Sequence, residues 1–275
     1  MLANLYRRYR HQLLPKIEDN KLAEIFHAVF KKIVFRRFEG FDRVEGKEMK
    51  IRDEDLDNLI ILDACRHDLF EEVVGECDFR YSQGSNSAEF IKKNFSEGDW
   101  SDALYVTANP HFHESQFKHI TGRDPGEVFH TVFHTYEDKW NKEKSTVMPS
   151  DVISDLKTAK KLFPDKKIIA HFMQPHFPFV NSEISSTGFN PEYEDEELGV
   201  WAKAQLGKLE REELWNAYAD NLKFVWEEIE EEINDLDGKT IVTADHGNFV
   251  GENGFYGHPY KVHAEVLLKV PWKEI

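Results

Sequence analysis

With 275 residues, of which 40% are hydrophobic and 31% charged, the chain has the size and composition of a globular protein with one large α/β core. Its formal net charge of −16 argues against a broad nucleic-acid-binding surface, because phosphate backbones require clustered Lys and Arg. No apolar run approaches the ~18 uncharged residues of a membrane span, charges interrupt every apolar run before Phe38, and two cysteines suit a reducing compartment, so we expect a cytoplasmic protein.

The first 38 residues are basic although the chain as a whole is acidic. They predict two helical pieces separated near Pro15, and in the second piece apolar residues recur at helical spacing. One interpretation is a helix that packs on the main body. The other is a basic amphipathic element that contacts a membrane surface peripherally, or an acidic partner. We expect residues 1–45 to form a basic helical segment and residues 46–275 to form the catalytic domain.

Short apolar runs alternate with amphipathic segments along the rest of the chain. Strands are predicted at Asn58–Asp63, Asp102–Thr107, Lys167–Met173, Lys239–Asp245 and Glu265–Val270, and helices at Asp68–Val74, Ser87–Phe95, Val152–Leu162 and Glu210–Leu236. This alternation predicts a doubly wound, largely parallel central sheet with helices on both faces. In such sheets, functional sites form beyond the carboxyl ends of the strands.

Two of the predicted strands end in an acid. Asp63 follows Leu-Ile-Ile-Leu, and Asp245 follows Ile-Val-Thr-Ala and precedes His246. Side chains at two strand ends can converge on one cation, and two oxygens with one nitrogen form a ligand set that suits Zn²⁺ or Mn²⁺. Either acid alone could instead cap the next helix or turn. The run from Asp245 through Gly247 to Asn248 is harder to explain in that way.

At its C-terminal end the sequence is similar to a known family. The segment Thr243–Asn248, followed by Gly251-Glu252 and then Gly257-His258-Pro259, resembles the metal signature of the alkaline phosphatase superfamily, with its sulfatase-like and phosphoglycerate-mutase-like members nearest.

Two upstream segments extend this resemblance. Asn58–Asp63 resembles the first strand of that fold, whose terminal acid binds metal, and Ala170–Pro178 resembles the sulfatase-like segment whose histidine contacts the bound anion. Leu62–Arg66 is similar to sulfatase-like proteins of archaeal type. The resemblance covers about residues 58–272. It implies an alkaline phosphatase-like fold and a metal-dependent hydrolase of phosphoric or sulfuric esters.

The resemblance also implies a nucleophile at the start of the helix after the first strand, bound to the metal through its side chain. Ser87 occupies that place, and Ser85 is the fallback. A bound metal lowers the pKa of a hydroxyl, and a helix N-terminus stabilises the resulting anion. Ser87 could equally be a helix cap, and the sequence pattern does not separate the two roles.

The cysteines decide against the formylglycine chemistry of sulfatases. That modification requires Cys-x-Pro-x-Arg, and neither Cys65 nor Cys77 lies in such a motif. A hydroxyl nucleophile therefore points towards phosphoester chemistry, although it does not exclude sulfate esters.

Histidines are the remaining candidates near the metal. Members of the superfamily use them either to hold a second metal, together with Asp ligands, or to bind the anion. This chain offers histidines there but no obvious extra Asp, so we expect one tight metal site, with two metals as the alternative. We assign His176, His258 and His171 to the substrate. Arg66 is a further candidate for the anion, with a salt bridge to Asp68 or another local acid as its alternative.

Four other histidines are set aside. His111 and His113 lie in a loop that could overhang the site, but no partner acid is evident. His130 and His134 have the spacing of a helical metal pair, yet their surroundings are typical of a strand, so we expect them to lie on the surface or in packing contacts.

The sequence leaves three functions open. The leading one is hydrolysis: Ser87 attacks a phosphoryl or sulfuryl centre of a small-molecule or glycan ester, and water then releases the group. The second is transfer of the group to a sugar or lipid hydroxyl, as in the phosphoglycerol and phosphoethanolamine transferases that the chain also resembles. The third is a non-catalytic binding module. We expect residues 86–151 and 181–209 to carry the specificity.

Overall fold

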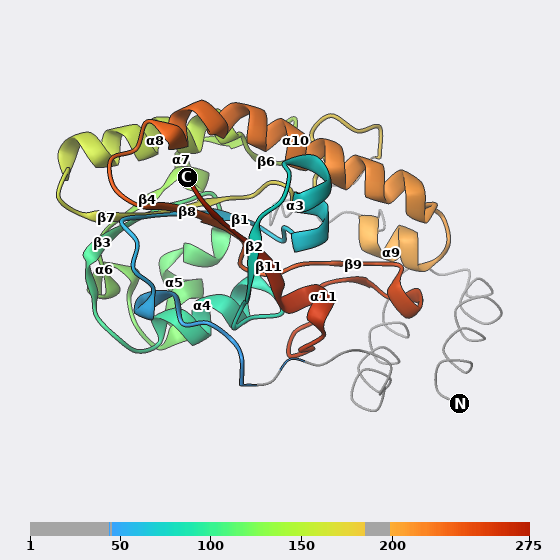
Figure 1. Cartoon of the computed structure of the whole chain (residues 1–275), viewed down its shortest axis with the longest axis horizontal. Coiled ribbons are helices and arrows are strands. Elements are labelled where there is room, and N and C mark those ends of the chain that lie inside the picture. The colour runs from blue at the N-terminus through green and yellow to red at the C-terminus, as the bar shows by residue number, and fades with distance from the viewer. Residues whose placement is uncertain (1–43, 45, 185–198) are drawn as a thin grey trace.

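A seven-stranded sheet runs through the centre of the molecule, as Figure 1 shows for a computed structural model that describes residues 44, 46–184 and 199–275. Its strands lie in the order β2 (Asp78–Tyr81), β11 (Lys269–Glu274), β8 (Thr240–Thr243), β1 (Asn58–Leu62), β7 (Lys167–Phe172), β3 (Trp100–Thr107) and β4 (Phe129–His134). The five strands from β8 to β4 are parallel, and β11 is antiparallel to both β8 and β2. The largely parallel sheet predicted from the sequence is confirmed.

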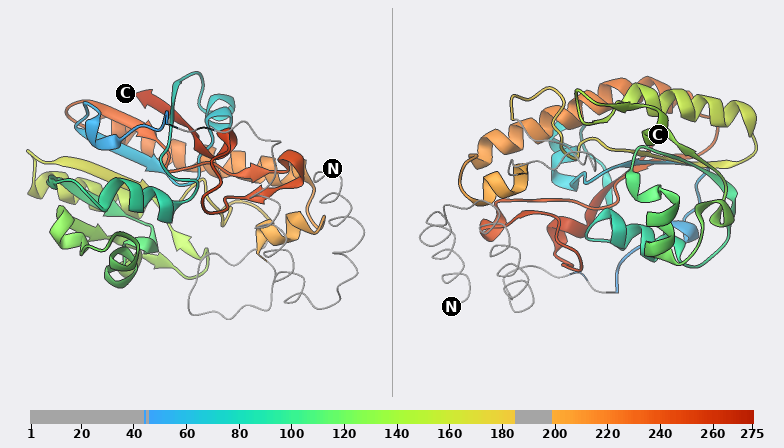
Figure 2. Two further views of the ribbon diagram at one scale, coloured as in Figure 1. Left: turned by 90° about the horizontal axis from the view of Figure 1, so that it is seen from below. Right: turned by 180° about the vertical axis from the view of Figure 1, so that it is seen from behind.

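Helices cover both faces of this sheet (Figures 1 and 2). One face carries α3 (His67–Val73), α8 (Pro149–Leu162) and α10 (Arg211–Asn234), and the other carries α4 (Ser87–Phe95), α5 (Glu114–Thr121) and α6 (Pro125–Val128). The shorter elements are α7 (Thr135–Asp138), α9 (Val200–Gln205), α11 (Glu265–Leu268), β5 (Trp140–Asn141), β6 (Thr146–Val147), β9 (Phe249–Val250) and β10 (Tyr256–Gly257). The doubly wound architecture is therefore also confirmed.

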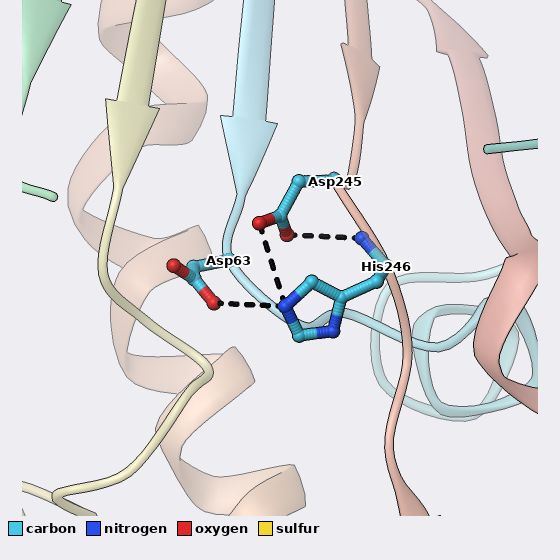
Figure 3. A group of neighbouring side chains, drawn as sticks. All are labelled: Asp63, Asp245 and His246. Atoms are coloured by element: carbon cyan, nitrogen blue, oxygen red, sulfur yellow. Dashed lines mark hydrogen bonds and ion pairs between the residues drawn. The ribbon is translucent and has the colours of Figure 1, made fainter. Parts of the chain in front are cut away.

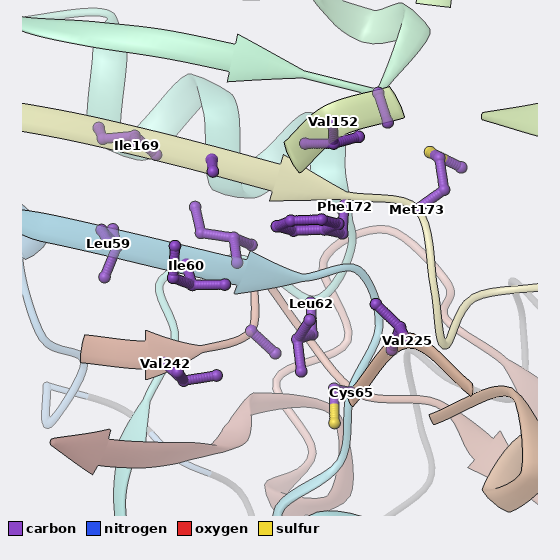
Figure 4. Close-up of a cluster of buried hydrophobic side chains, with 14 of the residues drawn as sticks. Leu59, Ile60, Leu62, Cys65, Val152, Ile169, Phe172, Met173, Val225 and Val242 are labelled. Carbon is purple, nitrogen blue, oxygen red and sulfur yellow. The ribbon is translucent and has the colours of Figure 1, made fainter. Parts of the chain in front are cut away.

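Strand β1 is the middle strand of the sheet, and all of its residues are buried. Ile60 is aligned with Ala170 of β7 on one side and with Val242 of β8 on the other. A strand with both faces covered reads as a continuous apolar run, which explains Leu-Ile-Ile-Leu. Figure 4 shows Leu59, Ile60 and Ile169 in the core around these strands. The rigid core fixes where the strand that ends in Asp63 releases the chain.

An aromatic cluster lies between α4 and the sheet. The ring of Phe95, near the end of α4, lies within 6.5 Å of six other aromatic rings, which belong to Phe90, Trp100, Tyr105, Phe112, Phe117 and Phe129. Such contacts stabilise a fold beyond the area they bury. They also hold α4, which begins at Ser87, against β3.

The last predicted strand is partly wrong. Residues 265–268 form the short helix α11, and the strand begins only at Lys269. The amide groups of Leu267 and Leu268 both donate to the carbonyl of Ala264, which closes a helical turn. The other predicted elements match the observed ones to within a few residues.

The prediction for the N-terminal segment lies outside the described residues, so the division into residues 1–45 and 46–275 stays a prediction. Among the helices that the structure describes, none combines the length and apolarity needed to cross a bilayer.

Candidate metal centre and active site

Three side chains converge at the carboxyl edge of the sheet. Asp63 directly follows β1, and Asp245 and His246 lie just beyond the end of β8, the strand next to it. All three are buried, and one ligand atom from each lies within 4.8 Å of the other two. Figure 3 shows the carboxylates of Asp63 and Asp245 both directed at the same ring nitrogen of His246, Nε2. The sequence placed the same three residues together.

Each carboxylate has one oxygen held by the protein and one without a partner. Asp245 Oδ1 accepts hydrogen bonds from the amides of Ala64 (2.9 Å) and His246 (3.0 Å), and Asp63 Oδ2 accepts one from the Asn109 side chain (2.9 Å). Within the described residues, Asp63 Oδ1 and Asp245 Oδ2 are buried and have no hydrogen-bond partner. Burying an unpaired charged oxygen is costly.

A divalent cation would remove that cost. The two unpaired oxygens lie 3.7 and 3.4 Å from His246 Nε2, so a single small ion can contact all three atoms. The residues present therefore fit a metal ion, and the ligand set of two carboxylates and one imidazole suits Zn²⁺ or Mn²⁺.

The His246 ring is oriented by its own backbone. Its Nδ1 donates to the carbonyl of Gly247 at 2.9 Å, which leaves the lone pair of Nε2 directed at the carboxylates. Gly247 itself is required by close packing, because a Cβ at that position would lie 2.4 Å from the carbonyl oxygen of Val266. The Asp-His-Gly motif thus combines two ligands with the one residue that fits against α11.

Ser87 lies at the same place. It is the first residue of α4, and its Oγ lies 3.3 Å from Asp63 Oδ2 and 3.3 Å from His246 Nε2. The cap of α4 is the preceding residue, Asn86, whose side chain accepts a hydrogen bond from the amide of Glu89. The alternative interpretation of Ser87 as the helix cap is therefore not supported.

The fallback serine has other partners. Ser85 Oγ lies 2.8 Å from a carboxylate oxygen of Glu89 and 3.0 Å from the carbonyl oxygen of Pro259. The geometry thus favours Ser87 over Ser85 as the candidate nucleophile.

His171 occupies a different position from the one we expected. It is fully buried in β7, its Nδ1 lies 3.0 Å from the hydroxyl of Tyr105, and its Nε2 lies 3.7 Å from Asp63 Oδ2 and 3.8 Å from Asp245 Oδ2. In the described part of the chain this Nε2 has no hydrogen-bond partner. The position suits contact with the metal-binding carboxylates better than contact with a substrate.

His176 and His258 lie side by side next to the metal group. Their ring centroids are 5.1 Å apart, and that of His258 is 4.6 Å from the ring of His246. The Nδ1 of His176 bonds to the carbonyl of Phe177, and the Nδ1 of His258 bonds to Asn248 Oδ1, each at 2.6 Å. These bonds orient both rings. The two histidines thus come together as the sequence interpretation requires.

Electrostatics link His176 to the metal group. Burial lowers the pKa of His176, against the opposing effect of the Asp63 charge. Burial by itself would raise the pKa of Asp63, but the neighbouring histidines, His176 foremost, hold it below its usual range. At neutral pH Asp63 is therefore ionised and able to bind a cation.

Arg66 matches the alternative that the sequence left open. Its guanidinium is buried, forms a two-point ion pair with Asp68, and also bonds to Glu252 Oε1 (2.7 Å) and to the carbonyl of Asn248 (3.0 Å). Burial alone would lower the pKa of Arg66, but these acids raise it. Arg66 thus holds the backbone that follows His246 in place, and its donors are directed at protein groups and not at a substrate.

Two residues that follow β3 also lie near the site: Asn109, which the sequence analysis missed, and His111, which it set aside. The Asn109 side chain donates to Asp63, and its Oδ1 lies 2.9 Å from both the backbone amide and the ring Nδ1 of His111. Burial lowers the pKa of His111, and the Asp63 charge opposes that shift. The rule that found Asp63, a polar residue beyond a strand end, would also have found Asn109. The other discounted pair does lie in packing contacts: His130 contacts Phe163, and His134 contacts Tyr136.

Comparison with known proteins identifies the fold. No protein-family model and no curated protein matches the chain. Among solved structures, the integral membrane protein lipooligosaccharide phosphoethanolamine transferase A from Neisseria meningitidis has a TM-score of 0.52 at 15% identity, over 91% of this chain and 54% of that one. Its soluble domain has a TM-score of 0.50 at 17% identity, over 84% of this chain and 78% of that one. A protein in the alkaline phosphatase superfamily from Vibrio parahaemolyticus has a TM-score of 0.44 at 12% identity, over 82% of this chain and 60% of that one.

At these identities the likeness shows the fold. The alkaline phosphatase-like fold expected from the sequence is confirmed. The chain spans about half the length of the integral membrane protein, 54% of it.

Proposed function

We propose that this chain is a metal-dependent phosphoester enzyme that transfers a phospho group, by way of Ser87, to a hydroxyl of a sugar or lipid acceptor. The observation that carries the proposal is the buried group in which ligand atoms of Asp63, Asp245 and His246 lie within 4.8 Å of one another, with Ser87 Oγ 3.3 Å from Asp63 and from His246. Burying two carboxylate oxygens without hydrogen-bond partners lowers the stability of the fold. Such oxygens next to a serine hydroxyl are what a metal-activated nucleophile needs.

Transfer takes precedence over the hydrolysis that led our sequence analysis. Two structures that match this chain with a TM-score of 0.50 or more are named as a phosphoethanolamine transferase and its soluble domain. Both reactions begin with the same step, and they differ only in whether an acceptor hydroxyl or water completes the reaction.

The residues of the site divide the chemistry among them. A divalent cation held by Asp63, Asp245 and His246 supplies the positive charge that lowers the pKa of a serine hydroxyl. Ser87 Oγ attacks the phosphorus, and the N-terminus of α4 favours the anionic oxygen. Asp63 Oδ2, at 3.3 Å, is placed to accept the hydroxyl proton. The bond to the leaving oxygen breaks, and a phosphoseryl group remains on Ser87.

The two histidines bind the phospho group. Because Nδ1 of each ring is held by a protein oxygen, Nε2 is the atom that can face the substrate. The negative charge of a bound phospho group would oppose the effect of burial on the pKa of His176 and favour the protonated ring. A protonated His176 or His258 would then donate from Nε2 to the phosphoryl oxygens, where charge accumulates in the transition state. In the second step an acceptor hydroxyl attacks the phosphoseryl group and restores Ser87.

Product analysis tests the proposal. Protein stripped of metal and reloaded with Zn²⁺ or Mn²⁺ is given bis-p-nitrophenyl phosphate with increasing glycerol. A transferase forms the glycerol ester in preference to the hydrolysis product, and releases p-nitrophenol faster as glycerol rises. A hydrolase forms p-nitrophenyl phosphate regardless of glycerol.

Two serine variants complete the design. Ser87→Ala should lower turnover by about 10³-fold or more, whereas Ser85→Ala serves as the matched control with a smaller effect. Turnover that survives in Ser87→Ala, or a protein that binds no divalent metal, would contradict the proposal.

A further inference from the structure

A further buried carboxylate, in addition to those of Asp63 and Asp245, belongs to Glu89. Glu89 is the third residue of α4, and only 2% of its surface is exposed. Its Oε2 accepts hydrogen bonds from the amide (3.1 Å) and the hydroxyl (2.8 Å) of Ser85, and from the amide of Lys261 (3.3 Å). Its Oε1 lies 3.1 Å from His263 Nε2. One carboxylate thus joins the start of α4 to a segment more than 170 residues away.

That segment, residues 258–263, is held at further points. The Ser85 hydroxyl lies 3.0 Å from the carbonyl oxygen of Pro259 and accepts a hydrogen bond from the amide of Val262 (3.3 Å). Lys261 has a φ of 60°, a backbone conformation that residues with a side chain rarely adopt. The contacts with Ser85 and Glu89 hold the segment in this conformation.

The arrangement depends on the hydrogen bonds that the Glu89 carboxylate accepts. Burial alone would raise the pKa of this carboxyl, but hydrogen bonds from His263 and Ser85 lower it to about 2. Glu89 is therefore ionised at neutral pH. Hydrogen bonds to both oxygens offset the cost of burying a carboxylate, and here both oxygens have partners.

The segment carries one residue of the proposed site, His258. Its ring is oriented by Asn248, and its backbone directly precedes Pro259, whose carbonyl oxygen lies 3.0 Å from Ser85 Oγ. Ser87 lies on the other side of the same junction, two residues before Glu89. The position of His258 relative to Ser87 thus depends on the contacts of Glu89.

We propose that Glu89 is a positioning residue that fixes the 258–263 segment against the first turn of α4, so that His258 and Ser87 act on the same phospho group. This inference rests on the proposed function and deepens it. Glu89 acts through His258, and among the described residues its contacts do not include Asp63, Asp245 or His246. Removing its charge should therefore affect anion binding and leave metal binding intact.

Binding of inorganic phosphate to the zinc-loaded protein, measured by calorimetry, tests this without turnover. Glu89→Gln keeps the size of the side chain and removes its charge. We expect one zinc per chain, as in the wild type, and a phosphate affinity at least tenfold weaker. His263→Gln should weaken phosphate binding in the same direction, and Glu89→Asp should recover part of the loss. Glu265→Gln is the matched control, because Glu265 also lies in the first turn of a helix and accepts a hydrogen bond from Tyr81.

A double-mutant cycle separates positioning from a general loss of structure. If Glu89 acts through His258, the variant Glu89→Gln/His258→Gln binds phosphate within about twofold of His258→Gln alone. Two effects that multiply, or an unchanged affinity in Glu89→Gln, would overturn the inference and leave the proposed function standing. If Glu89→Gln does not fold, the same cycle with His263→Gln decides. A zinc-loaded wild type that binds no phosphate would overturn both proposals.

Discussion

The unpaired oxygens of Asp63 and Asp245 show that this site is built at the expense of stability. The two buried carboxylates repel each other because an oxygen of each approaches the same nitrogen, His246 Nε2, and neither oxygen has a hydrogen-bond donor in the described part of the chain. Binding and stability should therefore respond in opposite directions when one charge is removed.

Asp245→Asn tests this opposition. The amide keeps an oxygen for the Ala64 and His246 amides, and its nitrogen can donate to His246 Nε2, which lies 3.4 Å from the present Oδ2. We expect the metal-free variant to be more stable than the metal-free wild type by about 1 kcal/mol, and its zinc affinity to fall at least 100-fold. Urea unfolding in a chelator and a zinc titration measure the two effects. A variant that is less stable without metal, or that binds zinc normally, would show that the carboxylates are not strained.

The pair formed by Glu89 and His263 makes a prediction about pH. The pKa of Glu89 falls from 4.5 to about 2 on folding, so its contribution is present above pH 4.5 and is lost as the pH falls through about 2. The hydrogen bond that His263 donates to Glu89 raises the pKa of His263 above 6.5, with Glu48 adding to this effect and burial and Lys93 opposing it. The contribution of His263 is therefore present below pH 6.5 and is lost as the pH rises through the raised value.

The excess stability of the wild type over Glu89→Gln should thus be largest between about pH 4.5 and 6.5 and decline on both sides. Urea unfolding of both proteins across the pH range measures it. In His263→Gln the decline on the alkaline side should disappear. A difference that does not change with pH would mean that the pair is not ionic.

Single residues could be predicted where a simple rule applied. Asp63 and Asp245 were found because each ends an apolar run. Ser87 was implied by the family resemblance together with its place at the start of a helix. Asn109 was missed because an amide is a weaker signal than an acid, although it holds Asp63. Arg66 could not be decided, because its choice between substrate and local acids depends on Glu252, which only folding brings near.

Among the elements, α4 links the site to the core. It presents Ser87 at its first turn, and near its C-terminal end Phe95 packs among six aromatic rings. We expect Phe95→Ala to lower the free energy of unfolding by about 3–5 kcal/mol, because the cavity cannot close against the sheet.

The control for that change is Phe79→Ala, because Phe79 lies in edge strand β2 and is 42% exposed. The Phe79 ring contacts those of His67 and Tyr81. Because the position is exposed, losing these contacts should lower the free energy of unfolding by about 0.5 kcal/mol or less. Denaturant unfolding compares the two variants. Equal losses would contradict the assignment of the aromatic cluster as the support of α4.

Two elements, β2 and α11, show where the sequence pattern failed to predict the structure. β2 contains no buried residue, so it carries no apolar run, and it is a strand only because β11 pairs with it. α11 was taken for a strand because its two leucines continue the apolar run of β11. The contacts that decide β2 are long-range, whereas local hydrogen bonds to Ala264 close the turn of α11. Central strands such as β1 can be predicted from the sequence alone, because a strand that is buried on both faces is a continuous apolar run.

For the molecule as a whole, a metal ion bound by Asp63, Asp245 and His246 would join the ends of β1 and β8. A ligand that binds the folded state alone stabilises it by about 2.7 kcal/mol when its concentration is 100 times its dissociation constant. Zinc should therefore raise the midpoint of thermal unfolding, and a chelator should reverse the rise. Asp245→Asn should show no such rise. Zinc that fails to stabilise the wild type would place the ion elsewhere.

The most direct test of the account is the covalent state of Ser87. Metal-loaded protein is mixed with bis-p-nitrophenyl phosphate, quenched in acid during turnover, and examined by intact-mass and peptide mass spectrometry. The account predicts one added p-nitrophenyl phosphoryl group per chain, located on Ser87, and none in chelator or in Ser87→Ala. Turnover that continues with no adduct at Ser87, and that Ser87→Ala does not reduce, would contradict it.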